Sequence, residues 1–178
     1  MRRTEPTARN LWILGLVTLA IFVVLGIIDR DLTDTGGPGI VSFEVEFTSD
    51  NARDTLAEWG EEGRDSAKLS LWLDYAFLVA YAAFFALAVV ALCEALGGGW
   101  RRFEFLATFP LVGAVCDAIE NAGLLMTIGQ DGAQPWPLIG GVFAVIKFAF
   151  LTPAQLFVLV GFVAWLATRG RRRRAAAG

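Results

Sequence analysis

The sequence predicts an all-α membrane protein: a four-transmembrane-helix up-down bundle with a small extracytoplasmic cap made of one strand and one short helix. Apolar residues make up 56% of the 178 residues, and the mean hydropathy is +0.56. Four long apolar stretches each approach or exceed the roughly 20 residues that cross about 30 Å of hydrocarbon. The connections between the last three stretches are short, which favours antiparallel neighbouring helices.

The four stretches organise the chain as a single membrane domain over residues 1–178. The predicted parts are spans at residues 11–28, 69–93, 103–128 and 138–168, an outer segment at 29–68 and a basic tail at 169–178. The first span is long for a signal peptide, and Asp29-Arg30-Asp31 follows it instead of a small-residue cleavage site. We therefore expect it to be an uncleaved anchor.

Charge is distributed unevenly along the chain and predicts its orientation. Acidic residues are concentrated in the outer segment, whereas arginines flank the other ends of the spans, at Arg2, Arg3, Arg9, Arg101, Arg102, Arg169 and Arg171–Arg174. By the positive-inside rule, both termini are then cytoplasmic and the acidic segment is outside. We expect Arg171–Arg174 to contact anionic lipid of the bilayer, and we expect no nucleic-acid partner.

The outer segment contains signals for local structure. Residues 40–47 alternate between apolar and polar side chains, which predicts a short strand with one apolar face. A helix over residues 51–59 would be capped by Ser49 or Asp50 and ended by Gly60. Gly63 predicts a second break, after which Asp65 or Ser66 would cap the second span.

Composition limits the chemistry that the protein can support. The chain has no histidine, which argues against the usual zinc, haem and histidine-ligated iron sites. Cys93 and Cys116 are predicted at different depths, so a disulfide between them is not expected. We expect no cofactor, and the sequence leaves a carboxylate-bound divalent metal undecided.

Ionisable side chains inside the apolar stretches predict the position of a site. Asp74, Asp117, Glu120 and Lys147 come from three predicted spans, at depths of about 9–16 Å from the outer surface if each residue rises about 1.5 Å. Charges at such depth normally face a protein interior or a wet cavity. Helical spacing puts polar neighbours on the same faces. The predicted ligand-binding residues are Asp74, Tyr81, Asp117, Glu120, Asn121 and Lys147, with no catalytic residue.

One lysine among three carboxyls leaves an excess of negative charge, so we expect at least one carboxyl to be protonated. We predict an outward-facing acidic site that binds or translocates a small cationic or amphipathic molecule or a proton. The alternative is a structural protein whose outer loop, Gly36–Lys68, binds a partner and whose buried charges lock the helices. An enzyme that uses the carboxyls as acid and base has the least support. A homo-oligomer is left open.

Three motifs carry a resemblance to known proteins. The stretches Trp59-Gly60-x-x-Gly63-Arg64, Ser70-Leu71-Trp72-Leu73-Asp74-Tyr75-x-Phe77 and Asp117-x-x-Glu120-Asn121 resemble those of small bacterial four-helix integral membrane proteins. This resemblance implies the four-helix topology and a bacterial inner membrane, without an activity. The layout of a large first outer loop and a small second one is also similar to claudins. The paired cysteines and Trp-Gly-Leu-Trp signature of claudin loops are absent, so the layout transfers no adhesion function.

Overall fold

The structure is a computed structural model that describes residues 4–34 and 36–175, with side chains described for residues 8–34 and 36–169. The helices, in chain order, are α1 (Thr4–Asp34), α2 (Ile40–Glu44), α3 (Ser49–Leu96), the 3-10 helix η1 (Gly98–Thr108), α4 (Phe109–Gly129) and α5 (Trp136–Ala175). The described residues are almost entirely helical and contain no strand. Arg2 and Arg3 and the side chains of Arg171–Arg174 lie outside the described residues.

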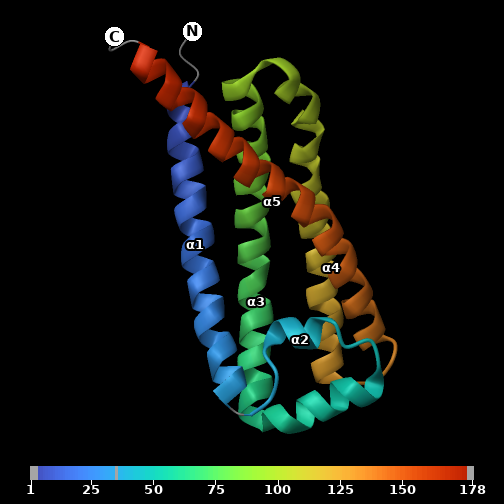
Figure 1. Ribbon diagram of the computed structural model, residues 1–178. Helices are drawn as coiled ribbons and strands as arrows, with labels where there is room; N and C mark the ends of the chain where they lie inside the picture. The colour runs from blue at the N-terminus through green and yellow to red at the C-terminus, as the bar shows by residue number, and fades with distance from the viewer. Residues whose placement is uncertain (1–3, 35, 176–178) are drawn as a thin grey trace.

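Within the described residues, four helical segments are long and apolar enough to cross a membrane: Ala8–Asp34, Ser49–Leu96, Gly98–Gly129 and Trp136–Arg169. This finding confirms the prediction of four helices long and apolar enough to span a membrane, and it supports a multi-pass membrane protein. Figure 1 shows α1, α3 and α4 running alongside one another, with α5 crossing them diagonally. The start of α1 and the end of α5 lie at the end of the bundle opposite α2.

The predicted strand over residues 40–47 is wrong, because the first part of this segment forms helix α2. Gly39 is extended (φ −71°, ψ 169°), and the backbone N–H of Ile40 donates to Asp29 Oδ1 at 2.6 Å. The carboxylate thus satisfies one of the free N–H groups at the start of the helix. Within the described chain, no second strand lies beside the segment to supply the hydrogen bonds of a sheet.

The predicted short helix that ends at Gly60 is confirmed as the first part of α3, although its cap differs from the prediction. Thr48 is the N-cap and accepts from the backbone N–H of Asn51 at 3.3 Å. Gly60 has φ 61° and ψ −161°, a conformation that favours glycine, and the chain turns sharply there. In Figure 1 this first part of α3 lies across the end of the bundle, beside α2.

The second predicted break, at Gly63 with a cap at Asp65 or Ser66, is wrong. The helix continues from Gly60 to Leu96 without a further non-helical residue. Arg64 Nε reaches back across the turn and donates to the Leu56 carbonyl at 2.9 Å. This bond satisfies a carbonyl near the turn at Gly60. Gly63 itself is buried within this continuous helix.

Helices α4 and α5 pack closely through glycines. A Cβ added to Gly123 would lie 3.0 Å from the backbone nitrogen of Gly140, and one added to Gly140 would lie 2.9 Å from Leu124. Small residues at such contacts let helix backbones approach one another, as is common in membrane bundles. The close approach brings Lys147 of α5 next to the acidic face of α4.

Helix α1 packs against α3 and leaves much of its apolar surface exposed. Gly15 of α1 faces Phe84, and the rings of Phe22 and Phe77 lie 6.1 Å apart between centroids. Large side chains such as Leu16 and Ile27 are more than half exposed. An apolar surface of this extent suits contact with hydrocarbon better than contact with water.

Candidate functional site

The centre of the site is the ammonium group of Lys147, which three carboxyl groups surround. Lys147 Nζ donates to Glu120 Oε1 at 2.9 Å, to Asp117 Oδ1 at 3.2 Å and to Glu44 Oε2 at 3.2 Å. The second oxygen of Glu120, Oε2, also lies 2.9 Å from the same nitrogen. A lysine ammonium has three N–H donors, so all of them are used.

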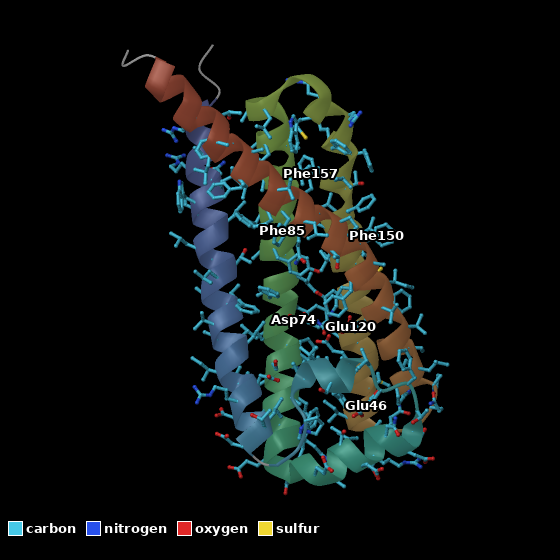
Figure 2. The ribbon with its side chains drawn as sticks, viewed as in Figure 1. Glu46, Asp74, Phe85, Glu120, Phe150 and Phe157 are labelled. Carbon is cyan, nitrogen blue, oxygen red and sulfur yellow. The ribbon has the colours of Figure 1, made fainter. Side chains whose placement is uncertain are left out.

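Polar side chains of α3 extend this cluster. The Tyr81 hydroxyl donates to Asp117 Oδ2 at 2.8 Å, so both oxygens of Asp117 accept hydrogen bonds. Asn121 Nδ2 donates to Asp74 Oδ2 at 2.7 Å and joins α4 to α3. Nearby, the Tyr75 hydroxyl donates to the carbonyl of Ala118 at 3.1 Å. Figure 2 shows Asp74 and Glu120 at a similar level of the bundle.

The structure therefore brings the six predicted site residues into one region, in two hydrogen-bonded groups. Tyr81, Asp117, Glu120 and Lys147 form one continuous hydrogen-bonded network. Asp74 does not bond Lys147 and is held instead by Asn121, the neighbour of Glu120 on α4. That these residues bind a ligand stays a prediction.

Glu44 is a member of the cluster that sequence reasoning missed. As part of a strand it would have pointed away from the apolar face, towards water. Helix α2 instead directs its carboxyl to Lys147, a residue 103 positions away in the chain. A helical reading would have found it, because Ile40, Phe43, Glu44 and Phe47 have the i, i+3, i+4, i+7 spacing of one helix face.

The cluster is enclosed and becomes more buried from Glu44 inwards. The side chain of Glu44 is 12% exposed, that of Lys147 8%, that of Asp117 4% and that of Glu120 0%. An open cavity of about 260 Å³ lies elsewhere, beside the turn at Gly60. Glu44 is therefore the member of the network nearest to solvent.

Helix α2 and its flanking residues are held over the cluster by several contacts. Phe43 is 1% exposed, and its ring centroid lies 4.7 Å from that of Trp59. The Trp59 indole N–H donates to the Pro38 carbonyl at 2.8 Å, and Gln134 Nε2 donates to the Phe47 carbonyl at 3.1 Å. These contacts hold Glu44 beside Lys147 of α5 and the acidic face of α4.

Burial raises the pKa of the two glutamates in this segment. Desolvation raises the pKa of Glu44 above its ordinary value, and the charge of Asp117 raises it further. The ammonium of Lys147 and a hydrogen bond with Glu120 oppose this rise. Burial also raises the pKa of Glu46, although a hydrogen bond from the Thr55 hydroxyl at 2.6 Å opposes it.

Comparison with family models, with curated proteins and with solved structures finds no match for this chain. The chemistry of the site follows from its groups. Carboxyl groups, a lysine and a tyrosine hydroxyl can bind a proton and pass it between hydrogen-bonded neighbours. Within the described residues, no group of three or more His, Cys, Asp or Glu side chains is arranged to hold a metal ion.

Proposed function

We propose that this protein is a multi-pass protein of a bacterial inner membrane that binds a proton or a small cation at the cluster around Lys147. Both termini would be cytoplasmic, and the end that carries α2 would face outwards, because the acidic segment lies there and Arg9, Arg101, Arg102 and Arg169 lie at the other end. The proposed ligand-binding residues are those predicted from the sequence, together with Glu44.

One observation carries this proposal: three carboxyl groups share one ammonium in an enclosed space, and a fourth carboxyl lies nearby. Glu44, Asp117 and Glu120 contact Lys147 directly, and Asp74 is hydrogen-bonded to Asn121, the residue that follows Glu120 on α4. Carboxylates that share a buried site cannot all ionise at ordinary cost unless cations balance them. A single lysine balances one, so the remaining negative charge favours uptake of cations from outside.

The packing of the cluster favours the proton over larger cations. All three N–H donors of Lys147 are in use, and Glu120 is completely buried. An organic ammonium would have to displace the lysine from its three acceptors. A proton needs no such displacement, because it binds directly to a carboxyl oxygen.

A second candidate function is supported by the same contacts. Lys147 joins α2, α4 and α5, so the cluster can act as a lock that fixes the helices while the outer loop Gly36–Lys68 binds a partner. Polar contacts between membrane helices average about 0.6 kcal/mol and reach about 1.7 kcal/mol. They therefore specify geometry even where they add little stability.

Carboxyl-stretch infrared spectroscopy of the purified protein in lipid nanodiscs distinguishes the two candidates. The proposed site predicts a band from protonated carboxyl at pH 7 that Glu120→Gln or Asp117→Asn weakens while helix content is retained. Glu62→Gln, which changes an exposed acid, should leave the band unchanged. Full ionisation of the wild-type carboxyls at pH 7, with loss of folded protein in both cluster variants, would favour the lock.

The proposed partners follow from position and charge. The lipid bilayer surrounds the exposed apolar faces, and anionic lipid would contact Arg171–Arg174 at the cytoplasmic side. We propose no nucleic-acid partner. A second copy of the chain remains a candidate partner at the outer loop or within the membrane.

A further inference from the structure

The segment that carries Glu44 has the geometry of a lid. Residues 36–47 leave α1, pass as α2 between the first part of α3 and the cluster, and return to the start of α3 (Figure 1). The inner face of this lid segment contributes Phe43 and Glu44, whereas Val41 and Ser42 on its outer face are exposed. The lid segment therefore separates the cluster from solvent on the side where Val41 and Ser42 are exposed.

The lid segment is joined to α1 and to α3 by non-helical backbone at each end. Gly36, at its start, has φ 96°, a conformation that favours glycine. At its other end, residues 45–48 have no helical structure of their own before Thr48 caps α3. Between these two ends, side chains of α2 and its neighbouring residues contact the bundle, as the ring of Phe43 does with Trp59.

Closure of the lid segment carries a fourth carboxyl into a cluster that is already acidic. The groups that face Glu44 are Lys147 on α5, Asp117 and Glu120 on α4, and, at longer range, Asp74 on α3. Without Glu44, Lys147 already has two carboxyl partners. An ionised Glu44 would therefore enter against excess negative charge, whereas a protonated Glu44 would not.

We propose that residues 36–47 form a pH-sensitive lid that closes over the cluster as Glu44 takes up a proton from the outer side and opens as that proton is released. The proton comes from water and binds a carboxyl oxygen of Glu44, and on opening it returns to water. This inference rests on the proposed function and adds the regulation of the same site. The burial that raises the pKa of Glu44 supports it independently of the cluster's overall charge.

The direction of the pH dependence follows from linkage. The pKa of Glu44 in the closed lid is raised above the ordinary value of 4.5 that it returns to when the lid opens. The closed state thus binds more protons, so its stability is fully present below pH 4.5 and is lost as the pH rises through the raised pKa. Linkage to one proton limits the change to about tenfold per pH unit.

Hydrogen exchange of the full-length protein in nanodiscs tests this proposal. Amides of the lid segment donate within it or to α1, as Ile40 does to Asp29 and Glu46 to the Phe43 carbonyl. After correction for the intrinsic pH dependence of exchange, their protection should fall by up to about tenfold per pH unit as the pH rises. Glu44→Gln should abolish this slope, whereas Glu62→Gln should retain it.

Protection of the wild-type lid segment that does not change with pH would overturn the proposal, and so would an unchanged slope in Glu44→Gln. The wild-type titration needs no variant, so the proposal stays testable if Glu44→Gln does not fold. If the infrared spectrum shows a protonated-carboxyl band at pH 7 but the amide protection of the lid segment does not change with pH, the lid is refuted and the proposed site stands. If the amide protection of the wild-type lid segment changes with pH but no protonated-carboxyl band is present at pH 7, the proposed site is refuted and the lid stands.

Discussion

Replacement of Lys147 by methionine tests how strongly the protein depends on the cation at the centre of the cluster. Methionine approximates the length and volume of the lysine side chain without its charge, so packing is largely retained. Three carboxyl groups that now contact Nζ at 2.9–3.2 Å would lose their shared donor.

Two estimates bracket the expected loss of stability. Three intramembrane polar contacts of about 0.6 kcal/mol each sum to about 2 kcal/mol. Removing one partner of a buried ion pair costs about 3–5 kcal/mol, because the other charge is left uncompensated. We therefore expect Lys147→Met to lower the free energy of unfolding by about 2–5 kcal/mol at pH 7.

The assay is denaturant unfolding of the protein in mixed micelles, followed by circular dichroism. Lys68→Met is the matched control, because Lys68 makes an exposed ion pair with Asp65 at 2.7 Å and should change stability by less than about 1 kcal/mol. Equal stability of Lys147→Met and Lys68→Met at pH 7 would refute the reasoning. It would mean that the buried carboxyls do not need the ammonium.

Two further substitutions test the packing that positions the site. Phe43→Ala should weaken docking of the lid segment by about 3–5 kcal/mol, measured as lost amide protection, whereas Val41→Ala on the exposed face of α2 should stay within about 0.5 kcal/mol of wild type. Gly123→Val should destabilise the protein by about 1–3 kcal/mol through a clash with Gly140, measured by chemical unfolding. Gly26→Val meets no atom within 4 Å and should have little effect.

The spans and the core of the site could be predicted because their signals are local and strong. Each apolar stretch is long enough to identify by itself, and the i, i+3, i+4 spacing of Asp117, Glu120 and Asn121 places them on one face of any helix. The depth of Lys147, estimated by counting residues from the end of its span, is similar to that of Asp117 and Glu120. Contact between these residues requires only that α4 and α5 be antiparallel neighbours, which a short connection favours.

The outer segment could not be predicted to the same degree, because contacts distant in sequence decide its structure. Residues 40–47 satisfy both an alternating pattern and a helical one, and the carboxylate of Asp29 helps to start the helix. The position of the Arg64 side chain likewise depends on a distant residue. Arg64 Nη1 donates to Asp131 Oδ1 at 2.9 Å, and the two residues are 67 positions apart in the chain. No local pattern contains either partner.

The most direct test of the central claim is the infrared spectrum of the wild-type protein in nanodiscs at pH 7, recorded in H2O and in D2O. The claim is that the buried cluster holds a proton that exchanges with water. It predicts a protonated-carboxyl band at neutral pH that shifts to lower frequency in D2O and weakens in Glu120→Gln. Complete ionisation of the carboxyls at pH 7 would contradict it.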